Sequence, residues 1–180
     1  MFDYINGKLV KVEPNFVVVD IDGWGVKLSI PSSTYNKLQH SLGEKIKLYV
    51  HMILREDFME LVGFYNDVER EAFILLNKVP GIGPRVGLSV LSIMDVGKLK
   101  ASILNEDIKA LVTVPGIGKK TAQKIIIDLK DRIKDLPVEN DESDTSVYFE
   151  ATEVLMSLGF SSSEIQLALD DDMVQQEYKV

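Results

Sequence analysis

The chain has 180 residues, of which 46% are hydrophobic and 27% are charged, so it can bury a core as one large domain or as two or three small ones. It contains no cysteine, which excludes disulfides and thiolate metal sites. No apolar segment approaches the roughly 18 residues that cross a membrane, and no basic stretch precedes an apolar run at the N-terminus. We therefore expect a cytoplasmic protein without a membrane anchor.

The formal net charge of −8 by itself disfavours nucleic acid as a partner, because phosphates are neutralised by Lys and Arg. The charge is unevenly distributed, however. Residues 1–65 hold 7 basic and 8 acidic residues, residues 66–136 hold 12 and 9, and residues 137–180 hold 1 and 11. The acidity is concentrated at the C-terminal end, and the middle of the chain is mildly basic.

Residues 1–65 have the pattern of a small β-barrel. Between turn signals such as Glu13-Pro14-Asn15 lie stretches rich in β-branched and aromatic residues, which predict strands at residues 4–12, 16–21, 26–30, 45–54 and 58–64. Between the third and fourth strands, residues 32–38 have room for one or two helical turns, with Ser32 as the expected N-cap. Five short strands and one short helix are typical of an OB-fold.

Residues 66–136 change to helical periodicity. Asn66 followed by Glu69 is similar to a capping box, and it begins a helix that continues to Pro80. Four more helices are predicted at residues 84–93, 96–104, 106–113 and 119–134. Asp95 and Asn105 are the expected N-caps of the helices at 96–104 and 106–113. We interpret this segment as a separate all-α domain, so the fold class is α+β with several domains.

The last part of the chain is predicted to be a linker and a third domain. Residues 137–146 have one aliphatic residue and many charges, a composition that indicates a flexible acidic linker. Helical spacing resumes at Val147, and Ser161-x-x-Glu164 is a capping box for a further helix. We therefore expect residues 147–180 to form a small C-terminal helical domain of the UBA-like type.

A doubled motif lies in the helical segment. Residues 79–85 have the sequence Val-Pro-Gly-Ile-Gly-Pro-Arg, which returns 35 residues later, at 114–120, as Val-Pro-Gly-Ile-Gly-Lys-Lys. Each copy separates two predicted helices, so we predict two helix-hairpin-helix motifs. Glycine at both turn positions can take φ > 0 and allows another backbone to approach, and amides at the start of the following helix point toward an anion.

The predicted ligand of the doubled motif is a DNA backbone, bound without regard to sequence. The alternative is that Gly-x-Gly merely connects two helices, but two copies followed by basic residues favour nucleic acid. The residues that we expect to bind backbone phosphates are Gly81, Ile82, Gly83, Arg85, Gly116, Ile117, Gly118, Lys119 and Lys120. Because the second copy carries two lysines, we expect it to hold DNA more strongly than the first.

In this order of domains the chain resembles the RuvA family of Holliday-junction-binding subunits. The family's Leu-Pro-Gly-Ile-Gly-Lys-Lys-Thr-Ala stretch is matched by Val114–Ala122, and Arg55-Glu56-Asp57 is followed by Val62-Gly63-Phe64. The resemblance extends over residues 1 to about 168. It implies a non-catalytic protein that holds a four-way junction open and square as a homotetramer or double tetramer, in DNA recombination and repair.

The resemblance also gives a role to Glu56 and Asp57, which fall in the connection between the fourth and fifth predicted strands. From sequence alone they are an ordinary solvated turn. In RuvA-like proteins the matching acids form a pin at the centre of the junction, where negative charge repels phosphates. Such a pin would help to separate exchanging strands and would penalise a plain duplex lying across the centre.

The partners implied by the resemblance are four-way junction DNA, a RuvB-type AAA+ ATPase and a RuvC-type resolvase. Leu155, Leu158 and Phe160 match the apolar positions that contact the ATPase, although each could equally be core of the small domain. The chain has no Walker-type phosphate loop, so ATP hydrolysis must belong to another chain. We expect no cofactor and no metal, since the carboxylate runs lie in the predicted linker and terminus without histidine nearby.

Two other functions remain open at this stage. Helix-hairpin-helix motifs also occur in repair nucleases and in glycosylases or lyases, and Asp128 is placed like the acid of the glycosylases, but no nucleophilic lysine and base pocket can be identified. A general duplex-binding protein is the third possibility. It predicts similar affinity for linear DNA and for junctions.

Overall fold

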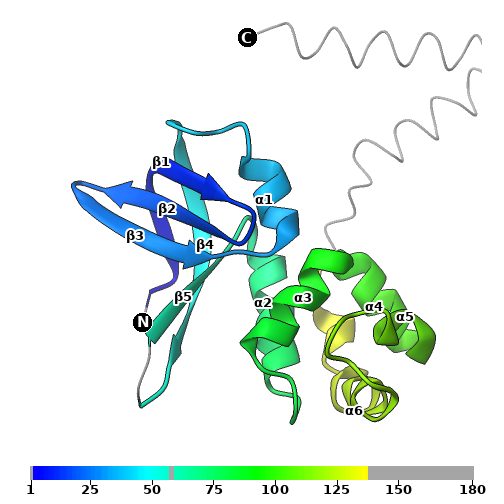
Figure 1. Cartoon of the computed structure of the whole chain (residues 1–180). Coiled ribbons are helices and arrows are strands. Elements are labelled where there is room, and N and C mark those ends of the chain that lie inside the picture. Colours follow the sequence, from blue (N-terminus) through cyan, green and yellow to red (C-terminus); the bar gives the residue numbers. More distant parts are fainter. Residues whose placement is uncertain (1, 57–58, 138–180) are drawn as a thin grey trace, which may run out of the picture. The chain divides into compact units, whose positions relative to one another are not determined.

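The computed structural model describes residues 2–56 and 59–137 (Figure 1). The chain divides into two compact units, Met1–Val138 and Glu139–Val180, and the described residues belong to the first. Apart from Pro137, the predicted linker and the predicted C-terminal domain lie outside the described residues. Their boundaries stay predictions, as do those of the two domains before them.

The first part of the chain is a closed five-stranded barrel, as predicted (Figure 1). Neighbouring strands follow the order β1-β2-β3-β5-β4, and β4 returns to pair with β1. Strand pairs are antiparallel except β3 and β5, which close the barrel through the single parallel pair Ser29↔Val62. The strands are β1 (Tyr4–Glu13), β2 (Phe16–Ile21), β3 (Trp24–Ser29), β4 (Lys45–Leu54) and β5 (Met59–Phe64).

Alternating side chains fill the barrel. Leu9, Val17 and Leu28 are fully buried, and they share one apolar cluster with Leu48 and Val50 of β4. Residues two positions apart on a strand point to the same face of the sheet. This is why the alternation of apolar and polar residues in the sequence predicted these strands. The strand ends differ by one or two residues from the prediction, chiefly in β3, which begins at Trp24 because the Asp22-Gly23 turn has positive φ at both residues.

The second part of the chain is all-helical. Its elements are α2 (Asp67–Asn77), α3 (Pro84–Ile93), α4 (Val96–Leu104), α5 (Ile108–Val112), α6 (Lys119–Leu129) and the 3₁₀ turn η1 (Ile133–Asp135), and the short α1 (Ser32–Leu38) lies in the barrel sequence. The predicted apolar face of the last helix is confirmed, since Ala122, Ile125, Ile126 and Leu129 are buried. That helix ends at Leu129 rather than at residue 134, and Ile133 packs into the same core from η1.

Side-chain caps fix three of these helices, and two of the predicted caps are confirmed. The Asn66 side chain accepts a hydrogen bond from the Glu69 amide at 2.8 Å, and the Asp95 side chain accepts one from Lys98 at 2.6 Å. The prediction for Asn105 was wrong. Asn105 is the C-cap of α4, and Asp107 caps α5 instead, because the left-handed φ of +55° at Glu106 separates the two helices.

The expected N-cap at the start of α1 was also wrong. Ser32 is the first helical residue and Pro31 occupies the cap position, without a side-chain hydrogen bond. The Ser32 amide instead donates a hydrogen bond to the hydroxyl of Ser92, which lies on α3, at 3.0 Å. A contact across 60 residues therefore replaces the local cap.

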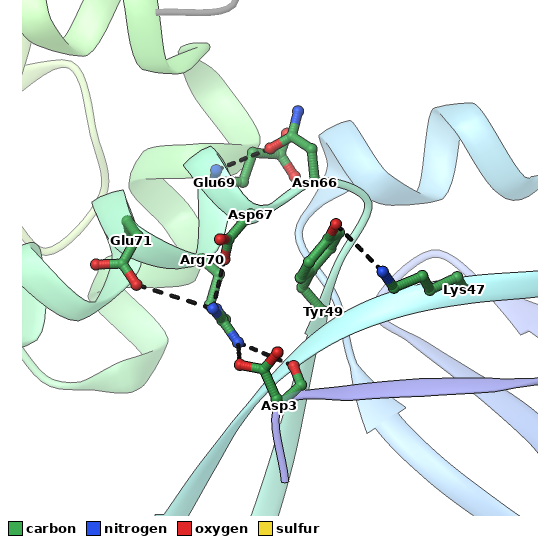
Figure 2. Close-up of polar contacts among 8 residues, drawn as sticks. All are labelled: Asp3, Lys47, Tyr49, Asn66, Asp67, Glu69, Arg70 and Glu71. Atoms are coloured by element: carbon green, nitrogen blue, oxygen red, sulfur yellow. Dashed lines mark hydrogen bonds and ion pairs between the residues drawn. The ribbon is translucent and has the colours of Figure 1, made fainter. Parts of the chain in front are cut away.

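Helix α2 joins the helical part to the barrel. Phe73 of α2 is fully buried against Phe64 of β5, with ring centroids 5.0 Å apart, and both belong to the apolar cluster that continues through the helices. Arg70 adds a polar connection, shown in Figure 2, in which its guanidinium bonds the Asp3 carboxylate at 2.5 Å and pairs with Asp67 of its own helix. Apolar and polar contacts together hold this helix against β5 and against Asp3, the residue just before β1.

Candidate nucleic-acid interface

The two glycine hairpins have the same backbone geometry. The first glycine of each has a left-handed conformation, with φ of +98° at Gly81 and +90° at Gly116. The second glycine of each is extended, with φ of −94° at Gly83 and −90° at Gly118. Only the first glycine of each hairpin therefore uses the φ > 0 that glycine permits, because the chain turns there and enters the next helix from an extended N-cap at the second glycine.

The isoleucine between the two glycines anchors each turn. Ile82 is 5% exposed and Ile117 is 4% exposed. Their amides donate to the carbonyls of Val79 and Val114 at 3.0 and 3.1 Å. Since both amides are already bonded within the hairpin, we assign the isoleucines a structural role and leave phosphate contact to the residues that follow them.

Those residues begin helices that have no cap of their own. Neither α3 nor α6 has a side-chain hydrogen bond at its N-cap, whereas α2, α4 and α5 are capped by Asn66, Asp95 and Asp107. The first intrahelical bonds are Gly87 N–H to the Gly83 carbonyl at 3.0 Å and Ala122 N–H to the Gly118 carbonyl at 2.9 Å. The amides before them have no partner within the helix and carry the positive end of its dipole.

The space in front of both N-caps is open. A Cβ placed on Gly83 or on Gly118 would meet no described atom within 4 Å. Because both glycines are extended, the fold itself does not require glycine at either position. Open space over free helix amides is the geometry that binds an anion such as a phosphate.

The two hairpins offer different numbers of donors. Pro84 is the first residue of α3 and has no N–H, so Arg85 and Val86 supply its free helical amides. The corresponding residues of α6 are Lys119, Lys120 and Thr121, all of which have an N–H. Arg85, Lys119 and Lys120 are exposed, so the second hairpin combines one more amide with one more cationic side chain.

The hairpins lie next to each other. A Cβ on Gly116 would be 3.2 Å from a methyl carbon of Val86, which is in the first turn of α3. Pro115 of the second hairpin also lines the same hollow as Arg85 of the first. The two uncapped helix starts therefore belong to one surface rather than to opposite sides of the helical part.

Residues on either side of the predicted pin lie beside the first hairpin. Arg55 and Glu56 are exposed just after β4, while Asp57 lies outside the described residues. A hollow of about 410 Å³ is lined by Arg55, by Glu60 of β5 and by residues 83–86 of the first hairpin. The base of the β4–β5 connection and the first uncapped helix start thus share one surface.

Comparison with known proteins identifies the same two parts. Residues 1–63 match the family described as "RuvA N terminal domain", and residues 73–131 match "SAM-like Helix-hairpin-helix tandem". A protein of Desulforamulus reducens, named "Holliday junction branch migration complex subunit RuvA", is 42% identical over 175 residues, which cover 94% of this chain and 86% of that protein. The chain belongs to the RuvA family.

Other RuvA proteins support the assignment. Proteins with the same name from Clostridium tetani and from Caldanaerobacter subterraneus are 39% and 38% identical, and the matches cover 94% and 95% of this chain and 89% and 90% of theirs. The OB-like barrel and the helix-hairpin-helix tandem that the sequence predicted are therefore confirmed both by structure and by family. Within the part of the chain that the structure describes, no helix is long and apolar enough to span a bilayer.

The structure brings residues 83–86 of the first hairpin into one hollow with Arg55, the residue before the predicted pin of this RuvA chain. The contacts of the hairpins and of Glu56 with DNA stay predictions. Leu155, Leu158 and Phe160 lie outside the described residues. The sequence analysis did not single out Glu60, which lines the hollow between Arg55 and the first hairpin. The only feature of the sequence that pointed to Glu60 was its position three residues after the predicted pin. Nothing else in the pattern of β5 set it apart.

Proposed function

We propose that this chain is the Holliday-junction-binding subunit of a branch migration complex. The observation that carries the proposal is the pair of adjacent helix starts, each without a side-chain cap, open in front and accompanied by exposed Arg85 or by Lys119 and Lys120. The shared name of the RuvA relatives supports a junction as the ligand. Backbone amides and basic side chains bind phosphates of any sequence, as a protein that must follow a moving crossover requires.

The proposed assembly is a homotetramer, or two tetramers that enclose the junction. One chain carries one pair of hairpins, and a four-armed ligand with approximate four-fold symmetry is matched by a cyclic tetramer. Eight hairpins acting together give tight binding even when each one is weak, because later contacts become intramolecular. This explains how a chain with a formal net charge of −8 can hold DNA.

The proposed pin selects the junction over plain duplex. Glu56 is exposed at the end of β4, and with Asp57 it would place negative charge at the crossover. Phosphates of a straight duplex lying across the centre would be repelled, whereas the four arms of an open junction leave the centre vacant. In this proposal the hairpins bind the DNA backbone, and the pin discriminates between a junction and a plain duplex.

The protein is proposed to act without catalysis of its own. A RuvB-type AAA+ ATPase would pump the arms that this chain positions, and a RuvC-type resolvase would act on the same junction. Leu155, Leu158 and Phe160 are the proposed contacts with the ATPase. Their contribution is testable by replacing each with Ser and measuring binding of the motor.

A gel-shift experiment separates this function from that of a repair enzyme. Purified protein incubated with a labelled four-way junction and Mg²⁺ should give a retarded complex with uncut strands. Nicked or cleaved product would instead establish a helix-hairpin-helix nuclease or lyase. Equal affinity for linear duplex and for the junction would establish a general duplex-binding protein. In a separate measurement of the mass of the complex in solution, a mass with one protein chain would exclude the tetrameric mechanism.

The pin is tested by the double substitution Glu56→Gln with Asp57→Asn. Removal of two negative charges should strengthen binding to linear duplex and reduce the preference for junctions by about tenfold, since each like-charge contact at a partly screened surface contributes about 0.5–1 kcal/mol. Competition of the bound junction by unlabelled duplex measures the preference. An unchanged preference would show that the two acids are an ordinary solvated turn.

A further inference from the structure

The carboxylate of Glu60 lies near groups that can bind a phosphate, namely the Arg85 side chain and the start of α3. It lies on β5, where it pairs with Ile53 of β4, next to the Leu54↔Met59 pair from which the pin connection begins. The Ser29 hydroxyl donates a hydrogen bond to Oε1 of Glu60 at 2.6 Å. This bond fixes the carboxylate on the wall of the barrel instead of leaving it to rotate in solvent.

Glu60 lines two hollows beside the hairpins. Glu60 and Arg85 line the hollow of about 410 Å³ that also contains Arg55 and Gly83. The same two residues line a second hollow of about 530 Å³ that reaches Pro115 of the second hairpin. A DNA backbone bound at the start of α3 and crossing either hollow would therefore run alongside Glu60.

A negative charge in this place opposes the attraction that the hairpin provides. The free amides of α3 and the Arg85 guanidinium attract a phosphate, while a carboxylate on the facing wall repels it. The repulsion between the carboxylate and the phosphates is greatest for a DNA backbone that continues straight over the hollow, as in plain duplex. At an open junction the strand turns away into the next arm, so fewer phosphates lie against the carboxylate.

We propose that Glu60 is a specificity-determining residue, a third negative charge that extends the action of the pin along β5 and disfavours plain duplex. The inference rests on the proposed function, because it assumes that the hairpins bind the DNA backbone. It differs from a purely structural role, in which the Ser29–Glu60 bond would serve to tie β3 to β5 at their single parallel pair, Ser29↔Val62.

The substitution Glu60→Gln distinguishes the two roles. Gln keeps an oxygen that accepts the Ser29 hydrogen bond and removes the charge. We expect the affinity for linear duplex to rise by about two- to fivefold at low salt, as is typical of one like-charge contact at a partly screened surface, and the affinity for the junction to rise by less than twofold. The gain for duplex should shrink as salt is increased.

Two matched variants complete the experiment. Ser29→Ala removes the hydrogen bond and keeps the charge, so it should lower the melting temperature with little effect on the preference for junctions. Glu44→Gln removes an exposed carboxylate just before β4 and outside both hollows, and it should leave the preference unchanged. All three proteins are used as full chains, and melting temperatures confirm that each is folded.

Several results would overturn the proposal. Unchanged duplex binding by Glu60→Gln would show that the charge does not reach the DNA. An equal gain for duplex and junction, or the same gain from Glu44→Gln, would show a general effect of net charge. A preference lost in Ser29→Ala but kept in Glu60→Gln would establish the structural role. Failure of the unaltered protein to prefer junctions would instead refute the proposed function itself.

Discussion

Alanine at the two glycines of the second hairpin should separate the stability of the fold from its grip on DNA. Gly116 has φ of +90°, and its added Cβ would be 3.2 Å from a methyl carbon of Val86. Gly118, two residues later, has φ of −90° and ψ of +170°, and its added Cβ would meet no described atom within 4 Å. The two substitutions have the same chemistry but opposite structural consequences.

The expected magnitudes follow from these surroundings. A left-handed non-glycine residue costs about 1–2 kcal/mol, so Gly116→Ala should lower the melting temperature by about 3–8 °C. Gly118→Ala should leave the melting temperature unchanged or raise it slightly, because a compatible Gly→Ala change gains about 0.4–1 kcal/mol from the unfolded state. Its methyl group, however, would occupy the space in front of the α6 amides. Loss of one charge-assisted hydrogen bond there is worth about 1.5–3 kcal/mol, or roughly ten- to a hundredfold in the affinity of one contact.

Thermal melts and junction titrations on the same samples test both halves. The expected result is a cross-over, in which Gly116→Ala is the less stable variant and Gly118→Ala is the weaker binder at a temperature where both are folded. Normal junction affinity in a folded Gly118→Ala variant would refute the phosphate cradle. If Gly116→Ala had the same melting temperature as the unaltered protein, the expected cost of a non-glycine residue at this left-handed position would be refuted. Gly83→Ala offers an independent repeat of the binding half, since its Cβ also meets no described atom within 4 Å.

Further predictions concern charge and pH. Replacing Lys119 and Lys120 by Gln should weaken junction binding more than replacing Arg85, and should reduce the slope of log affinity against log salt by about 2 per bound subunit rather than about 1, as measured by titration from 50 to 200 mM salt. Burial, followed by the charge of Arg70, lowers the pKa of His51. The unfolded chain therefore binds a proton that the folded chain does not, and the unfolding free energy should fall as pH decreases below about 6.5, as measured by urea titration at pH 7.5 and 5.5. Arg70→Gln should raise the His51 pKa in an NMR titration.

The secondary structure was largely predictable because the signals that specify it are local. Period-2 alternation identified the five strands, and Pro-Gly-Ile-Gly identified both hairpins, since proline fixes φ and glycine permits the positive φ of a tight turn. The mistakes arose where two local signals competed. Asn105 and Asp107 are both good caps, and the choice between them depends on the left-handed φ of Glu106, which no residue type dictates.

The contacts that position the site were not predictable from local patterns. Arg70 and Asp3 are 67 positions apart, and Ser29 and Glu60 are 31 apart, yet each pair bonds directly. Spacing along the chain gives no reason to associate them, because their proximity results from closure of the barrel and the packing of α2 on it. The sequence could therefore suggest the hairpin glycines and the pin acids as candidate site residues, but it gave no reason to include Glu60, which lines the hollow beside the first hairpin.

The proposed division between binding of the DNA backbone and discrimination of the junction follows from the geometry of the two elements. An uncapped helix start binds any phosphate that reaches it, so neither hairpin can distinguish a junction arm from a linear duplex. Discrimination requires a group that costs one substrate more than the other, and a fixed negative charge beside the DNA path has that property. If Glu60 acts together with the pin acids, neutralising all three should raise duplex affinity toward junction affinity while junction binding itself stays strong. A protein that instead lost both together would show that grip and selection reside in the same residues.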